Sequence, residues 1–195
     1  MKLDYWHIRK VFEKKGYTFY DDMKEFNVNI FGIRCAVDTN YYDDLICVAY
    51  RDEFKYEVVE IFQGTTDPGK YWLKNPMNSG GTATLVTGQY KAYKIDKHNG
   101  QYDAICQRRG KVKVYRDGNK DTIHDMDVDS ITEGYYGINL HRGSLKSFKY
   151  INKWSAGCQV ISIGWDRFME IAKKSVAIYG NKLTYTLFDR TDFEL

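Results

Sequence analysis

The chain has 195 residues, of which 43% are hydrophobic, and this predicts one domain or one domain with a small extension. Its 29 basic and 26 acidic residues nearly balance, which argues against nucleic acid as a partner. No segment has the ~18 consecutive apolar residues of a membrane span, and residues 1–17 lack the apolar run of a secretory signal, so we expect a protein made in the cytoplasm.

Two predicted helices bracket a series of short predicted strands. Residues 4–15 place apolar side chains on one helical face, between a capping Asp4 and a terminating Gly16. Near the other end, residues 166–179 repeat apolar side chains at helical spacing and stop at Gly180. Strand-like runs occupy residues 26–30, 45–50, 56–62, 82–86, 89–95, 102–107, 111–115, 135–141, 158–163 and 183–188.

This order of elements is typical of a mainly β protein. Eight or more short strands favour either a sandwich or a barrel. We expect an N-terminal α/β extension at residues 1–58, packed on a main domain at residues 59–195.

Two segments carry reactive side chains at sharp, small-residue turns. The run 135–141 ends at His141, and the turn 155–157 leads into Cys158 at the start of an apolar run. The loop between them is short enough for its ends to meet at a modest entropic cost. Together they would form the base and nucleophile of cysteine catalysis, with a neighbouring imidazolium favouring the thiolate. The backbone N–H groups of Gly157 and Cys158 are predicted to hold an oxyanion, and Ala156 to leave room for a substrate carbonyl.

These residues resemble the motifs of the L,D-transpeptidases, the YkuD-like family. That family carries a His-Gly pair and, after a gap, Ser-His-Gly-Cys; the corresponding strings here are His141-Arg142-Gly143 and Ser155-Ala156-Gly157-Cys158. The resemblance covers about residues 60–165. Residues 65–69 and 81–85 look like the substrate-side turns of the family.

The resemblance implies a β-sandwich with a short N-terminal helix and a C-terminal helix. It also implies acyl transfer on peptidoglycan stem peptides through a thioester on Cys158, without a cofactor. His141 would be the base, and the backbone carbonyl of Arg142 would be the third member of the catalytic group, after Cys158 and His141. The remaining predicted site residues are Ser155, Ala156, Gly157 and Gly143 as oxyanion or support residues, and Gln159 and Tyr136 as substrate contacts.

Two positions depart from the family pattern. Ala156 replaces the second His of the motif, and Val160 replaces the Arg found two residues after the Cys. These departures leave open a second hypothesis, a non-catalytic phage structural or cell-wall-binding module with a degenerate site. The strings also resemble those of phage and prophage proteins of gut bacteria, which would be delivered to the cell wall by other means. Transpeptidation and hydrolysis both remain open.

One acidic loop is a weak candidate for calcium. Asp117, Asn119, Asp121 and Asp125 occupy positions one, three, five and nine of a calcium-type loop, but its glycine and final glutamate are missing. We therefore predict a solvated turn there and no metal elsewhere. His98 is predicted to lie exposed in a turn.

Overall fold

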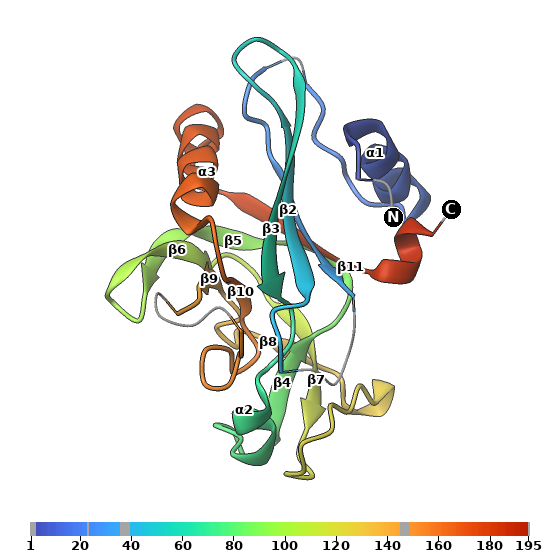
Figure 1. Ribbon diagram of the computed structural model, residues 1–195, viewed down its shortest axis with the longest axis vertical. Coiled ribbons are helices and arrows are strands. Elements are labelled where there is room, and N and C mark those ends of the chain that lie inside the picture. The colour runs from blue at the N-terminus through green and yellow to red at the C-terminus, as the bar shows by residue number, and fades with distance from the viewer. Residues whose placement is uncertain (1–2, 23, 36–39, 145–148, 195) are drawn as a thin grey trace.

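The computed structural model describes residues 3–22, 24–35, 40–144 and 149–194. The chain is mainly β, as predicted. The larger group of strands consists of β1 (Asn29–Arg34), β2 (Asp44–Arg51), β3 (Glu57–Thr65), β5 (Gly88–His98), β6 (Tyr102–Gln107), β9 (Leu140–Arg142), β10 (Gln159–Ile161) and β11 (Leu183–Asp189). They close into a barrel in the order β1-β11-β5-β6-β9-β10-β3-β2 (Figure 1).

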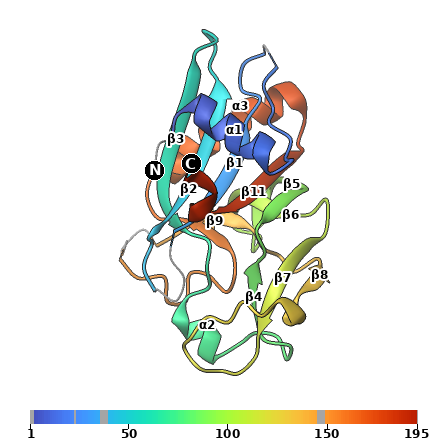
Figure 2. The same ribbon diagram turned by 90° about the vertical axis from the view of Figure 1, so that its right-hand side faces the viewer.

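A smaller antiparallel sheet lies beside one end of the barrel. It contains β4 (Thr82–Leu85), β7 (Val112–Asp117) and β8 (Thr132–Gly134), in the order β4-β7-β8. The short helix α2 (Lys70–Lys74) lies next to this sheet at the same end of the molecule (Figures 1 and 2). Two 3-10 turns, η1 (Val128–Ser130) and η2 (Arg190–Phe193), complete the described elements.

The two predicted helices are present. Helix α1 (Tyr5–Lys14) starts at Asp4, whose Oδ1 accepts a hydrogen bond from the His7 backbone N–H at 2.8 Å. Helix α3 (Trp165–Tyr179) ends at Gly180, where φ is +81°. Figure 2 shows α1 lying across the outside of the barrel, whereas α3 lies at its upper end. None of the helices in the described part of the chain is long and apolar enough to cross a membrane.

The barrel strands separate two apolar cores. The larger core fills the barrel and the space under α3, and it includes Ile46, Leu140 and Leu187. The second core lies between α1 and the outer faces of β1 and β11, where Phe12 packs edge-on against Phe188 with ring centroids 4.9 Å apart. Burial on both faces explains why β1 shows no alternation of exposed and buried residues.

The strands pair very unevenly around the barrel. β2 and β3 pair over eight residues, whereas β6 and β9 share the single residue pair Ile105↔Leu140. The strand predicted over residues 135–141 is wrong for its first part, because β9 begins only at Leu140. Gly137 adopts φ +69°, which ends extended pairing, and the segment before β9 is held by side-chain hydrogen bonds instead.

The expected boundary at residue 58 falls inside β3. The residues before it contribute β1 and β2 to the closed barrel, so they form an integral part of it. The sandwich implied by the resemblance is replaced here by a closed barrel with an attached sheet.

Candidate functional site

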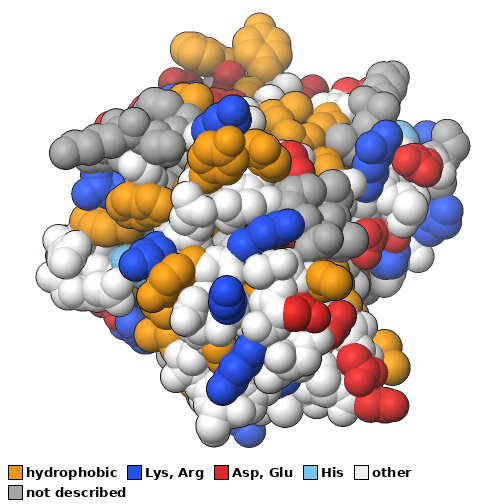
Figure 3. Space-filling model, turned by 60° about the horizontal axis from the view of Figure 1, so that its bottom comes forward, with side chains coloured by type: hydrophobic (Ala, Val, Ile, Leu, Met, Phe, Trp, Pro, Cys, Tyr) orange, Lys and Arg blue, Asp and Glu red, His pale blue; other side chains and the backbone are white. Residues whose placement is uncertain are grey.

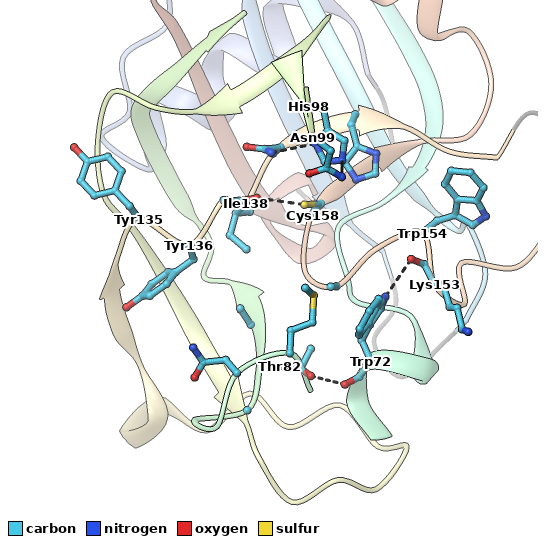
Figure 4. A pocket seen from close by; sticks show the side chains of 18 of the residues that line it. Trp72, Thr82, His98, Asn99, Tyr135, Tyr136, Ile138, Lys153, Trp154 and Cys158 are labelled. Atoms are coloured by element: carbon cyan, nitrogen blue, oxygen red, sulfur yellow. Dashed lines mark hydrogen bonds between the residues drawn. The ribbon is translucent and has the colours of Figure 1, made fainter. Parts of the chain in front are cut away.

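A cavity of about 630 Å³ lies between the barrel and the three-stranded sheet. The barrel contributes the ends of β5 and β9 and the turn before β10, while β4, β7 and α2 form the opposite walls. Cys158 and His141 both line it. Figure 4 shows Cys158 at the base of the cavity, between Tyr135 and Tyr136 on one wall and Trp72, Lys153 and Trp154 on the other.

Neighbouring parallel strands bring Cys158 and His141 to the same face of the sheet. In the β9–β10 register, Val160 pairs with His141. Because side chains alternate between the two faces of a strand, Cys158 lies on the same face as Val160 and therefore on the same face as His141. The two residues that the sequence selects are thus brought together.

The turn before Cys158 is fixed by glycine and by a buried serine. A Cβ on Gly157 would lie 2.1 Å from the Ala83 carbonyl oxygen, and its φ of +121° also favours glycine. Ser155 is fully buried; its hydroxyl donates to the Cys158 carbonyl at 2.7 Å and accepts from the Gly157 N–H at 3.1 Å. Gly157 therefore has no free N–H for an oxyanion, and the backbone N–H of Cys158 remains the candidate donor.

Of the other predicted site residues, Gly143 lies away from the cavity, whereas Ala156 and Tyr136 line it. The Gly143 N–H donates to the Ile161 carbonyl at 2.7 Å, which continues the β9–β10 ladder away from the cavity. Ala156 lines the cavity near Cys158, as does Tyr136.

The His141 ring has a defined tautomer. Its Nδ1 lies 2.8 Å from the Arg142 carbonyl oxygen, the contact implied for the third member of the site. Since a carbonyl can only accept, Nδ1 carries the proton and Nε2 is left with its lone pair. The Arg142 side chain does not reach the cavity, because its guanidinium lies over the Tyr102 ring at 4.4 Å.

Burial keeps both members of the pair neutral in this structure. It raises the pKa of the Cys158 thiol to about 11 and lowers the pKa of His141 to about 4. The thiol donates to the Gly137 carbonyl at 3.4 Å, and no hydrogen bond joins it to His141 in the described part of the chain. The expected thiolate–imidazolium pair is therefore not favoured, because burial penalises both charges.

Three further polar residues organise the site, and the sequence analysis did not select them. His98 lies over His141, with ring centroids 4.2 Å apart and planes 25° apart, and is half-buried where an exposed residue was expected. Asn139 is bonded to His98 through its amide nitrogen at 3.1 Å. Buried Gln107 accepts the N–H groups of Tyr136 and Ile138, each at 3.1 Å. Gln107 is the last residue of β6, which also contains Asp103, so no pattern in the sequence singled it out.

The prediction that Gln159 contacts the substrate is wrong. Gln159 pairs with Leu140 and therefore points to the opposite face of β10 from Cys158. It is fully buried in the barrel, where its Oε1 accepts from the Tyr185 hydroxyl at 2.9 Å.

The substrate-side turn expected at residues 65–69 is also buried. Arg34 pairs there with Asp67 at 2.8 Å, and both side chains are under a tenth exposed, so this turn contributes a buried ion pair. Residues 81–83 do line the cavity.

The cavity lining carries positive but no negative side chains among the described residues. Arg116 is fixed by hydrogen bonds to the Gly81 carbonyl and the Thr132 hydroxyl and lies over the Tyr136 ring at 4.3 Å. Arg108 pairs with Asp96 at 3.5 Å, whereas no ion pair joins Arg116 or Lys153 to a carboxylate in the described residues. Figure 3 shows Lys and Arg side chains over the middle of this end of the molecule, with Asp and Glu gathered to one side.

Hydrogen bonds within the acidic loop occupy several of its side-chain oxygen atoms, whereas the buried Oδ1 of Asp117 has no hydrogen-bond partner among the described residues. The Asn119 amide nitrogen lies 3.0 Å from Asp121 Oδ2 and 2.7 Å from Asp125 Oδ2, and Asp117 accepts from the Asp125 N–H. Within the described residues, no group of three or more His, Cys, Asp or Glu side chains is placed to hold a metal ion.

No protein-family model matches the chain, and comparison with curated proteins and with solved structures found no match.

Proposed function

We propose that the chain is a cysteine-dependent acyl transferase of the L,D-transpeptidase type that acts on peptidoglycan stem peptides. The observation that supports it best is the placement of Cys158 and His141 on one face of adjacent parallel strands, lining one cavity. The Nδ1–H of His141 is held by the Arg142 carbonyl, which leaves Nε2 as the only basic nitrogen of that ring.

The neutral pair implies that proton transfer accompanies attack. As Cys158 Sγ attacks the substrate carbonyl carbon, His141 Nε2 accepts the thiol proton. The Cys158 N–H stabilises the negative oxygen of the tetrahedral intermediate. Nε2 then returns the proton to the leaving amine and the thioester remains, to be cleaved by an acceptor amine or by water.

The charge of the cavity supports an acidic peptide as the substrate. Arg116 and Lys153 offer two cations with no carboxylate partner in the described residues, and stem peptides carry free carboxylates. Trp72, Trp154 and Tyr136 add aromatic faces against which a peptide backbone can pack.

A second candidate is a cell-wall-binding module without catalysis. The hydrogen bond from the thiol to the Gly137 carbonyl favours it, because that bond occupies the thiol proton. Such a module would use the same cavity to bind stem peptides and leave them intact.

Digestion of purified muropeptides, read by mass spectrometry, separates the two candidates. We expect the wild type to convert stem peptides, and both Cys158→Ala and Cys158→Ser to lose at least ~10³-fold in turnover while still folding. Cys35→Ser, which changes a thiol outside the cavity, is the matched control and should retain turnover. Binding without conversion by the wild type would favour the non-catalytic module.

A further inference from the structure

Two histidines are stacked at the edge of the cavity, although only His141 has a role in the proposed reaction. His98 is the last residue of β5, and its ring lies 4.2 Å from the His141 ring, nearly parallel to it. Figure 4 shows the His98 side chain beside Cys158. A second imidazole in this position needs a physical explanation.

Asn139 fixes the protonation of the His98 ring. The Asn139 Oδ1 accepts the Gln107 backbone N–H at 2.9 Å, and a backbone N–H can only donate. The amide nitrogen of Asn139 must therefore face His98, where it donates to Nδ1 at 3.1 Å. Nδ1 is thus an acceptor, and the proton of the neutral ring is on Nε2. This is the opposite tautomer to that of His141. The amide of exposed Asn99 lies 3.3 Å from Nε2, and since no other hydrogen bond among the described residues fixes its orientation, it can turn its Oδ1 toward that N–H.

The surroundings of His98 also disfavour a charge on it. Burial and the nearby Arg108 lower the pKa of His98. Tyr102, from β6, lies against the ring with centroids 5.6 Å apart, and His141 covers the other neighbouring face. No carboxylate lines the cavity among the described residues, so nothing there favours the imidazolium form. Charging His98 would also place an Nδ1–H against the Asn139 amide hydrogens.

A neutral stacked ring suits a neighbour that becomes charged during the reaction. The hydrogen bond to Arg142 holds one edge of His141 but leaves the tilt of the ring to its packing. His98 supplies that packing, and the π face of a neutral imidazole can lie against the His141 imidazolium without repulsion. A charged His98 would oppose that imidazolium at close range.

We propose that His98 is a positioning residue for the base: Asn139 holds it as a neutral Nε2–H imidazole, and its stacked ring fixes the plane in which His141 Nε2 meets the Cys158 thiol. Its kinetic consequence rests on the proposed function, whereas its tautomer does not. The two parts are therefore tested separately.

The tautomers can be read directly by long-range ¹H–¹⁵N correlation spectra, because the chain has only 4 histidines. At pH 7 we expect His98 to carry its proton on Nε2 and His141 on Nδ1. His7→Phe, on the distant helix α1, serves as an assignment control and should remove one set of signals and leave these two unchanged. A cationic His98, or one protonated on Nδ1, would overturn the proposal whether or not the protein is an enzyme.

Asn139→Asp is an isosteric change that tests whether the Asn139 amide fixes the tautomer of His98. A carboxylate can still accept the Gln107 N–H, but it favours Nδ1–H on His98, which reverses the tautomer of the ring and raises its pKa. We expect kcat to fall at least ~10-fold at pH 7 with KM nearly unchanged, and the acid limb of the pH profile to move. An unchanged His98 titration, or unchanged kcat despite a charged His98, would contradict the proposal.

His98→Ala and His98→Phe separate the stack from the imidazole. Loss of the ring should lower kcat by ~10–100-fold, whereas Phe retains a flat neutral ring and should restore most of the loss. Equal losses in the two variants, with both folded, would reject positioning by the stack. If the wild type converts no stem peptide, the proposed function fails. The tautomer of His98 is then still tested by the spectra alone.

Discussion

The two sides of the barrel are built differently. On the side covered by α1, β2 and β3 pair over eight residues, and aromatic rings from α1, β1 and β11 form a dry core. On the other side, β9 and β10 are three residues each, and β9 shares only one residue pair with β6. The long β2–β3 ladder holds its strands together by backbone hydrogen bonds, whereas the short β6–β9 pairing provides few of them.

Side chains replace the missing ladder on the side with the cavity. Gln107 bonds the segment before β9 and Ser155 closes the turn before β10, while Asn139 links β9's approach to β6. The barrel is therefore stabilised mainly on the side covered by α1. The other side keeps polar groups and a cavity close together at the cost of backbone pairing.

The largest effect on stability should come from the aromatic side. Phe31 is fully buried and contacts the rings of Phe12 and Phe188. We expect Phe31→Ala to lower the free energy of unfolding by about 3–5 kcal/mol, measured by urea titration. The turnover of the fraction that remains folded should be close to that of the wild type, since the cavity lies across the barrel. A loss below 1 kcal/mol would mean that stability is not concentrated there.

On the side with the cavity, buried His141 should make the free energy of unfolding depend on pH. Because folding lowers the pKa of His141 to about 4, its contribution is present above ~6.5, the ordinary value, and is lost as the pH falls to 4. Between pH 7 and pH 4 the wild type should lose about 3 kcal/mol more than His141→Gln. Buried Asp44, whose pKa burial raises to about 7, acts in the opposite direction in both proteins and cancels in the difference. Parallel pH profiles of the two proteins would contradict the burial of a neutral base.

Gln107 should matter more for the site than for the barrel. Gln107→Leu removes four side-chain hydrogen bonds, to Gly110, Gly134, Tyr136 and Ile138. We expect about 2 kcal/mol of destabilisation and a loss of turnover of at least ~10-fold, because the wall of the cavity is no longer held. Gln89→Leu, which removes hydrogen bonds to Thr18 and Thr186 away from the cavity, is the matched control and should leave turnover unchanged. Equal effects of the two changes would remove the distinction between the sides.

The smallest predicted effect concerns substrate charge. Arg116→Gln should raise KM by up to ~10-fold, about 1.4 kcal/mol, for stem peptides with a free carboxylate and leave kcat nearly unchanged. The same stems with amidated carboxylates should show little difference between the two proteins. Arg109→Gln changes a cation that does not line the cavity and serves as the control. A KM that does not respond to either change would argue against an anion subsite at Arg116.

The sequence predicted best where local patterns decide the structure. The caps at Asp4 and Gly180 set the ends of α1 and α3, and apolar runs located most strands. The sequence also predicted that Cys158 and His141 lie near each other, since both stand at small-residue turns, and both line one cavity. Gln159 was misplaced because the face of a three-residue strand depends on its register with β9. His98 was missed because only the tertiary fold brings the β5–β6 turn over β9.

The most direct test of the central claim is the mass of the intact protein during turnover. After rapid mixing with a tetrapeptide-stem muropeptide and acid quenching, the wild type should gain the mass of the acyl fragment, located on Cys158 by peptide mapping and removed by hydroxylamine. Cys158→Ala should gain nothing, and His141→Gln should form the adduct at least ~10²-fold more slowly. Conversion of the muropeptide by Cys158→Ala at the wild-type rate, or an adduct located on another residue, would contradict the assignment of Cys158 as the nucleophile.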